Sequence, residues 1–155
     1  MNWNAIAAIA ETFGAIGVVI TVAYLAFQIR QNTNSIQGST EQTLMSLEMS
    51  MYHLLAQHAD LYKRGSADVA DLTPDETNVF EFLVSAVMSQ MYSAFAQYRR
   101  KLITPAVWET YLTEWESDYL THSGFQHQWE LIEHAYPKDF RQSLDQVKKR
   151  ANRAG

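Results

Sequence analysis

The sequence contains no cysteine, and its 155 residues include only three prolines and six glycines. The absence of cysteine rules out disulfide bonds and a thiol nucleophile, and it fits a reducing compartment. The chain also has no Gly-x-Ser-x-Gly elbow, no HExxH or Glu-x-x-His step and no glycine-rich phosphate loop. Its formal net charge of −5 lacks the basic excess typical of nucleic-acid binding. We therefore expect a protein that is not an enzyme, has no cofactor and binds no nucleic acid.

What the sequence does contain is a long apolar run near its start, Ala5–Phe27, in which Glu11 is the one ionisable side chain. About 23 residues at a rise of ~1.5 Å form a helix of roughly 34 Å, enough to cross a hydrocarbon core of about 30 Å. Trp3 precedes the run and Tyr24 lies near its end, and aromatic side chains prefer the water–lipid interface. The run therefore predicts a single transmembrane helix.

Three other interpretations of this run were weighed. A cleaved signal peptide would need a basic start, but no Lys or Arg precedes Arg30, and no small-residue cleavage site follows. A core helix of a soluble oligomer stays open, because Ala-rich segments insert less strongly than Leu-rich ones. An interfacial helix needs a polar face, and the run has none after Glu11.

The distribution of basic residues predicts the orientation of the span. Basic residues are retained on the cytoplasmic side, and Arg30 follows the run, with Lys63 and Arg64 further along the chain. We therefore expect a bacterial inner-membrane protein with its N-terminus outside and its C-terminal domain in the cytoplasm. The bilayer itself is then the first partner.

Three residues within the run are candidates for a functional role. An acid in hydrocarbon is costly and often functional, which singles out Glu11. If the buried part begins only at Thr12, however, Glu11 lies among the headgroups, and we favour that interpretation. Gly14 and Gly17 belong to two small-xxx-small pairs, Ala10/Gly14 and Gly17/Thr21, whose spacing allows helices to approach closely in lipid.

The rest of the chain has helical periodicity throughout, so we predict an all-α fold: an N-terminal transmembrane helix followed by a bundle of about four to five helices. The expected domains are an anchor with its junction at 1–33 and a cytoplasmic helical domain at 34–155. Within the second, residues 31–40 are polar and fit either a linker or a helix that continues out of the membrane. Apolar seams then run from Leu44, Val79, Trp108, Phe125 and Phe140.

Local signals predict where these helices begin and end. Lys63-Arg64-Gly65 should end the helix of residues 44–61, whose apolar seam includes His58 as a buried histidine. Residues 66–72 are expected to form a loop. Thr73-Pro74-Asp75-Glu76 should cap a central core helix that runs to about Leu102. Thr104-Pro105 repeats the start signal, and Ser123-Gly124 should separate the last long helices.

Two groups of polar residues deserve a functional interpretation beside the structural one. His127, Glu130 and His134 share a helix face at steps of three and four, so a metal-dependent enzyme is an alternative, although a solvated face is favoured. The acids between Glu109 and Asp118 are likewise interpreted as solvated, and the aromatic stripes of Trp108/Trp115 and Phe125/Trp129 as core. Two basic clusters at helix ends suit the macrodipole or a lipid surface: Arg99, Arg100 and Lys101; Lys148, Lys149 and Arg150.

The junction Tyr24-Leu25-Ala26-x-Gln28-Ile29-Arg30-Gln31-Asn32-Thr33 resembles a family of short, uncharacterised bacterial membrane proteins with one N-terminal span. Tyr98-Arg99, Trp108-Glu109, Gly124-Phe125 with Trp129, and Phe140-Arg141 follow the order of that family's helical C-terminal part. The resemblance implies an inner-membrane location and carries no activity.

These observations predict a membrane-anchored helical scaffold or an accessory/assembly protein. Its expected partners are a second copy of the chain or another membrane protein. One alternative is a homo-oligomeric, channel-like pathway across the membrane, in which Glu11 faces inward. The other is the metal-dependent enzyme that uses His127, Glu130 and His134.

Overall fold

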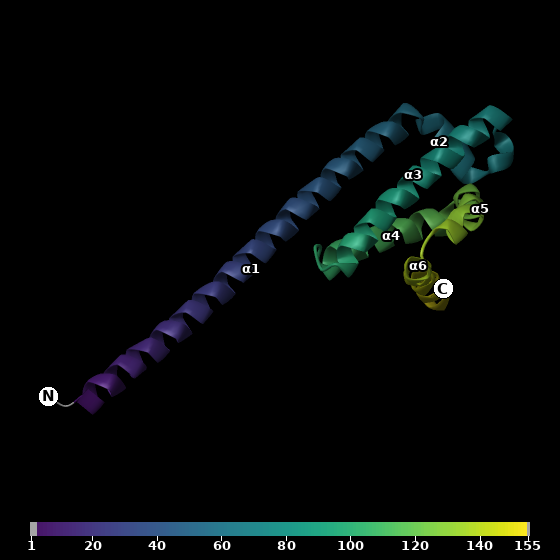
Figure 1. Ribbon diagram of the computed structural model, residues 1–155. Helices are drawn as coiled ribbons and strands as arrows, with labels where there is room; N and C mark the ends of the chain where they lie inside the picture. The colour runs from purple at the N-terminus through teal and green to yellow at the C-terminus, as the bar shows by residue number, and fades with distance from the viewer. Residues whose placement is uncertain (1–2, 155) are drawn as a thin grey trace. The chain divides into compact units, whose positions relative to one another are not determined.

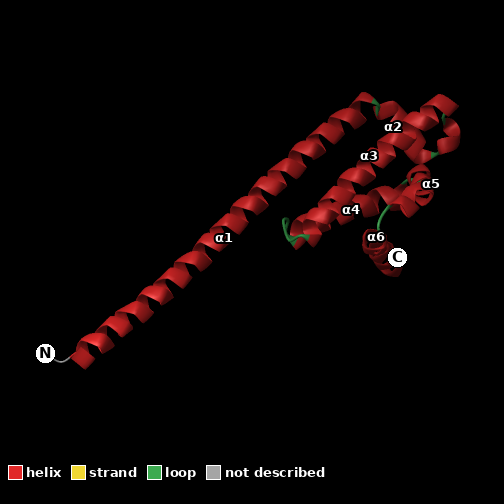
Figure 2. Ribbon diagram, viewed as in Figure 1, coloured by secondary structure: helices red, strands yellow, loops and turns green. Residues whose placement is uncertain are grey.

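The structure is a computed structural model that describes the backbone of residues 3–154 and the side chains of residues 3, 11–119, 121–147 and 149. Over the described residues the chain is helical and contains no strand (Figure 2). The prediction of an all-α fold is thus confirmed. The chain divides into two compact units, Met1–Ser39 and Thr40–Gly155, where we expected a boundary after residue 33.

The helices follow one another with short connections (Figure 1). The described elements are α1 (Trp3–Gln57), α2 (Ala59–Ala67), the 3₁₀ turn η1 (Val69–Asp71), α3 (Pro74–Arg99), α4 (Pro105–Thr121), α5 (Ser123–Ile132), the 3₁₀ turn η2 (Glu133–Ala135) and α6 (Lys138–Ala154).

The first compact unit consists of the α1 residues up to Ser39. Residues 31–40 are α-helical, so of the two possibilities for this polar stretch the linker is wrong and the continuing helix is right. Every side chain described between residues 11 and 36 is exposed. By length and composition, the part of α1 from Glu11 onward could cross a membrane, and none of its most apolar window is buried.

The second compact unit is organised around α3, which packs on α2, α4 and α5. Phe80, Val84, Met88 and Ala94 on α3 are all fully buried. This confirms the expected central core helix. The helix is also long and apolar enough to pass as a membrane span, but 39% of its most apolar window is buried, as in the core helix of a water-soluble bundle.

The predicted N-terminal caps of α3 and α4 are confirmed. Thr73 Oγ1 accepts from the backbone N–H of Glu76, whose carboxylate in turn accepts from the backbone N–H of Thr73 at 2.9 Å. Thr104 Oγ1 accepts from the backbone N–H of Val107, and Pro105 occupies the first turn of α4. Each cap fixes where its helix enters the bundle, because the cap satisfies amide groups that have no partner within the helix.

The predicted end of the first long helix is wrong. Helix α1 stops at Gln57, and α2 carries the chain on to Ala67, so Gly65 lies inside a helix. Gly65 does not have the positive φ of a glycine stop, and it is buried beneath Phe80 instead. His58, expected to be buried, is exposed at the break between α1 and α2.

The chain also turns earlier than expected between α4 and α5. Helix α4 ends at Thr121 and α5 begins at Ser123, which leaves His122 as the break and places Gly124 within α5. Ser123 Oγ donates to the carbonyl oxygen of Ala67 at 2.5 Å and so ties the start of α5 to the end of α2.

The C-terminal helices complete the core with aromatic side chains. Phe140 on α6 lies 5.3 Å from Phe95 of α3 and 6.3 Å from Trp129 of α5, measured between ring centroids. Phe140, Leu144 and Trp129 are almost entirely buried. The prediction that these aromatic stripes are core is confirmed for Trp108, Trp115, Phe125 and Trp129.

Candidate functional site

The three candidates in the apolar run lie on the exposed surface of α1. Glu11, Gly14 and Gly17 are each exposed, and a Cβ built on either glycine would meet no atom within 4 Å. Thr21 Oγ1 donates to the carbonyl oxygen of Gly17 at 2.8 Å, so this hydroxyl is satisfied within its own helix. Positions 10, 14, 17 and 21 follow one another at steps of four, three and four and therefore fall on one seam of the helix.

The basic cluster at the end of α3 engages its neighbours in the bundle. Arg99 Nη1 lies 3.5 Å from Asp139 Oδ2, and its guanidinium carbon lies 5.9 Å from the centre of the Phe95 ring. Arg100 and Lys101 are exposed beside it. In the second cluster Lys149 is exposed, whereas the side chains of Lys148 and Arg150 fall outside the described residues.

The histidine–glutamate face is divided between two elements. His127 and Glu130 belong to α5, but His134 lies in the 3₁₀ turn η2, so the expected single helix face is not present. All three side chains are exposed. Among the described residues, no group of three or more His, Asp or Glu side chains is placed to hold a metal ion.

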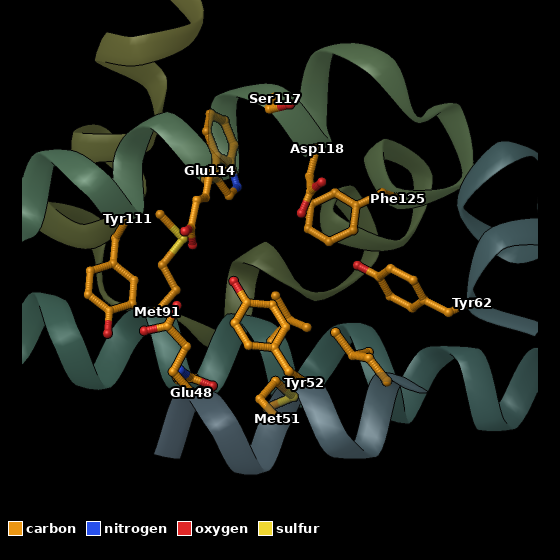
Figure 3. A pocket seen from close by; sticks show the side chains of 14 residues that line it. Glu48, Met51, Tyr52, Tyr62, Met91, Tyr111, Glu114, Ser117, Asp118 and Phe125 are labelled. Carbon is orange, nitrogen blue, oxygen red and sulfur yellow. The ribbon is translucent and has the colours of Figure 1, made fainter. Parts of the chain in front are cut away.

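The structure contains a half-open hollow of ligand size that the sequence did not indicate. It lies in the second compact unit and has a volume of about 310 Å³ (Figure 3). We call it the tyrosine–acid pocket, after the tyrosines Tyr52, Tyr62 and Tyr111 and the acids Glu48, Glu114 and Asp118 in its wall. The remaining wall is mostly apolar: Met51, Leu55, Val87, Met91, Trp115 and Phe125, together with Gln90 and Ser117.

Several helices supply this wall. Glu48 and Tyr52 come from the last third of α1, one turn apart, and Glu114 and Asp118 come from α4, also one turn apart. Figure 3 shows Glu114 and Asp118 projecting from α4 toward the space into which Tyr52 points from α1. Tyr62 reaches in from α2 with its hydroxyl toward Asp118. Residues far apart in the sequence thus converge on one cavity.

The acids of the pocket are held in an environment that disfavours their charge. Burial raises the pKa of Glu114, and the negative charges of Glu48 and Asp118 raise it further. Burial also raises the pKa of Asp118, an effect that His122 partly opposes. Both shifts follow from the removal of water and from like charges close together. The pocket therefore favours an added positive charge.

Burial and the neighbouring acids also raise the pKa values of the three tyrosines in the pocket. Burial raises the pKa of Tyr62 to about 12, assisted by the charge of Asp118. The pKa of Tyr111 is likewise raised to about 12, by burial and then by Glu48 and Glu114. The pKa of Tyr52 is raised by burial and then by the neighbouring acids Glu114, Glu48 and Asp118. All three phenols are therefore neutral near pH 7, with intact aromatic faces.

A smaller hollow of about 150 Å³ shares Glu48, Tyr111 and Glu114 with the pocket and continues along α1 to Glu41. The acidic character thus extends along the groove between α1 and α4. Among the described residues, acids line both hollows, and neither hollow is lined by a Lys or Arg.

Sequence reasoning missed this site for an identifiable reason. The acids of α4 were interpreted as a solvated face, and this is wrong for Asp118, which is half-buried. Glu114 is exposed as expected, but it also lines the pocket. Glu48 and Tyr52 drew no attention because neither belongs to a motif. The available signal was the pair of i, i+4 steps, Glu48/Tyr52 and Glu114/Asp118, but pairing them required knowledge that α1 and α4 line the same cavity.

Comparisons of the chain with protein-family models, with curated proteins and with solved structures gave no match.

Proposed function

We propose that the protein is a membrane-anchored helical module that scaffolds or assembles, either with a second copy of itself or as an accessory subunit of another membrane protein. The observation that carries this proposal is the apolar surface of α1 between residues 11 and 29. Large apolar side chains on this surface are exposed; Phe13 is 71% exposed and Phe27 is 64% exposed. In water, exposure of this apolar surface is unfavourable, whereas in the hydrocarbon core of a bilayer the penalty of hydrating it disappears.

The length of this surface suits a bilayer. Residues 11–29 make about 19 residues at ~1.5 Å each, or roughly 28 Å, close to the ~30 Å of a hydrocarbon core. Tyr24 and Arg30 then lie toward the end that leads into the second unit, where an aromatic ring and a cation suit the headgroups. Glu11 stands at the opposite end, within reach of the other interface.

The seam of small residues supports assembly. Gly14 and Gly17 lie in open space, so a second helix could approach the backbone there without displacing a side chain. In lipid, where burial of apolar surface does not drive association, such close backbone contact is a main source of helix–helix attraction. A dimer or a complex with another single-span protein would bring these glycines into contact.

The orientation proposed is N-terminus outside and helical domain in the cytoplasm of a bacterial cell. Arg30 is the basic residue nearest the span, and basic residues stay on the cytoplasmic side. The resemblance of the Tyr24–Thr33 junction to bacterial single-span proteins supports the inner membrane.

Assembly can be tested on the full chain in a maltoside detergent by size exclusion with light scattering, and in native membranes by cross-linking. We expect an oligomer or a specific copurifying membrane protein. Gly14→Leu together with Gly17→Leu should abolish the association, because both side chains would fill the seam. Ala23→Leu adds bulk on the opposite face, and Gly38→Leu removes a helical glycine outside the span, so both should leave association intact.

A monomer without partners would contradict assembly. Equal association of the wild type and all three variants would contradict the role of the glycine seam alone. The absence of native cysteine makes orientation easy to measure. In spheroplasts, a membrane-impermeant maleimide should label Asn2→Cys, and it should label Asn34→Cys only after lysis. The reverse pattern would invert the topology, and loss of the protein to the soluble fraction would remove the anchor.

A further inference from the structure

We propose that the tyrosine–acid pocket binds a small organic cation, a protonated amine or quaternary ammonium group carried on an apolar body. This site is separate from the membrane anchor and from any assembly through it, since every residue that lines the pocket belongs to the second compact unit. The proposal rests on three features of the cavity: its charge, its aromatic surfaces and the spacing of its acids.

The charge of the wall is one-sided. Glu48, Glu114 and Asp118 line the cavity, and no Lys or Arg whose side chain the structure describes lines it. Carboxylates that are partly shielded from water and close to one another gain from a cation placed between them. An anionic ligand would meet only repulsion, and a neutral ligand would leave the acids uncompensated.

The aromatic surfaces fit an ammonium group with carbon attached. Tyr52, Tyr62 and Phe125 face the space in front of Asp118 and Glu114 (Figure 3). The negative faces of aromatic rings attract a cation, and desolvation strengthens that attraction. Met51, Leu55 and Met91 supply the apolar part of the wall. An organic cation can use the aromatic and apolar surfaces together, whereas a hydrated inorganic ion can use neither.

A bare metal ion suits the pocket less well. Ca²⁺ and Mg²⁺ require several oxygen ligands at about 2.0–2.6 Å from one centre. The described acids do not form such a group. A delocalised or methylated cation tolerates wider spacing, because it interacts with charge and ring faces over several ångströms. The volume of about 310 Å³ is at the lower limit of ligand pockets, which restricts the occupant to a small molecule.

The test is calorimetric titration of the full chain in maltoside micelles, near pH 8 so that the carboxylates are ionised. The probe is benzyltrimethylammonium, with benzyl alcohol as a neutral control and benzenesulfonate as an anionic one. We expect saturable binding of the cation with one site per chain, and no saturable binding of the two controls.

Variants locate the site. Glu114→Gln with Asp118→Asn should weaken cation binding by at least ~10-fold, which corresponds to the loss of about 1.4 kcal/mol. Glu109→Gln with Glu130→Gln removes the same net charge from positions outside the pocket and should leave the affinity unchanged. Tyr52→Phe keeps the ring and should bind almost normally, whereas Tyr52→Leu should bind several-fold more weakly.

Each contrary result identifies a different error. Equal affinity in the wild type and the Glu114/Asp118 variant would overturn the site. Equal binding of benzyl alcohol would mean an apolar hollow without charge recognition. If Ca²⁺ or Mg²⁺ displaced benzyltrimethylammonium at concentrations below that of the probe itself, the pocket would be a metal site. Cooperative unfolding of every variant, followed by tryptophan fluorescence, confirms that lost binding does not reflect lost structure.

Discussion

Gly124 of α5 packs directly on the backbone of Gly65 in α2. A Cβ built on Gly124 would overlap the carbonyl oxygen of Gly65, and a Cβ built on Gly65 would lie 2.6 Å from Cδ2 of Phe80. Neither glycine has a positive φ, so their role is close approach and not backbone freedom. Helix α5 can approach α2 this closely because Gly124 lacks a side chain, and the missing side chain of Gly65 leaves room for Phe80 of α3.

This contact predicts that Gly124→Ala is destabilising. The added methyl meets backbone, which cannot rotate away, so α5 must move from α2; we expect a loss of about 1–3 kcal/mol, the usual cost of overpacking. The measurement is urea unfolding followed by tryptophan fluorescence, since Trp108, Trp115 and Trp129 are buried in the same unit. Gly38→Ala, in open space, should leave this transition unchanged or raise its midpoint. Equal midpoints for Gly124→Ala and the wild type would contradict the contact.

A second prediction concerns the end of α3. Lys101 has a φ of 61°, in the left-handed region, and its amide donates to the carbonyl oxygen of Tyr98 while that of Leu102 donates to Gln97. This is a Schellman end with lysine where glycine is preferred. Lys101→Gly should therefore stabilise the unit by about 0.5–1 kcal/mol in thermal or urea unfolding. Arg100→Gly, at a residue of ordinary right-handed conformation, should not stabilise it.

Gly65 and Gly124 also show which features of the fold can be predicted from local sequence and which cannot. The predicted caps at Thr73 and Thr104 are present because a cap depends on residues only three apart. Gly65 and Gly124 were interpreted by the same local logic as breaks, and both lie inside helices. Their reason is a contact between segments about 60 residues apart in the sequence, which local patterns do not encode.

The pocket was out of reach for a related reason. Helical periodicity identified the core faces of α3 and α4, because the spacing of apolar residues along a helix predicts which of its faces is buried. It did not reveal that the face of α4 bearing Glu114 and Asp118 meets Glu48 and Tyr52 of α1. An acid at helical spacing looks solvated until its neighbouring helix is known. The membrane role of residues 11–29 stays a prediction.

The third prediction concerns acid sensitivity at the α2–α3 corner. Arg64 donates to Glu76 at 2.6 Å and to Asp60 at 3.0 Å, and the hydrogen bond from Arg64, followed by those from Thr73, lowers the pKa of Glu76 to about 2. An acid with a depressed pKa in the folded state contributes stability above its unfolded value of 4.5, and this contribution is lost as the pH falls toward 2.

We therefore expect Glu76→Gln to lower the midpoint of urea unfolding at pH 7 but to have little effect near pH 2. Thr73→Ala removes the cap itself and should cost about 1 kcal/mol at neutral pH. Asp75→Asn, also in the first turn of α3, is the matched control. A Glu76→Gln effect that is equally large at both pH values would show that its carboxylate charge is not the cause.

The fourth prediction concerns two acids whose pKa values are raised, so their effect on the pH dependence of stability is opposite to that of Glu76. Burial and neighbouring acids raise the pKa of Glu114, and burial raises that of Asp118. An acid with a raised pKa in the folded state contributes stability below its unfolded value, and this contribution is lost as the pH rises through the folded value. The groups that face these acids are Glu48 and Tyr52 of α1, Tyr62 of α2 and His122 after α4.

Glu114→Gln with Asp118→Asn should consequently be at least as stable as the wild type near pH 7, and its stability should fall less between about pH 4 and pH 7. Urea unfolding across this range measures both quantities, and Glu109→Gln with Glu130→Gln controls for net charge. His122→Gln, measured alongside, separates the influence of His122 on Asp118 from the effect of the acids themselves. If the cation site is real, benzyltrimethylammonium should raise the wild-type midpoint most at high pH, where both carboxylates are charged, and should leave the double variant unmoved. A ligand effect that is independent of pH would separate the binding from these two acids.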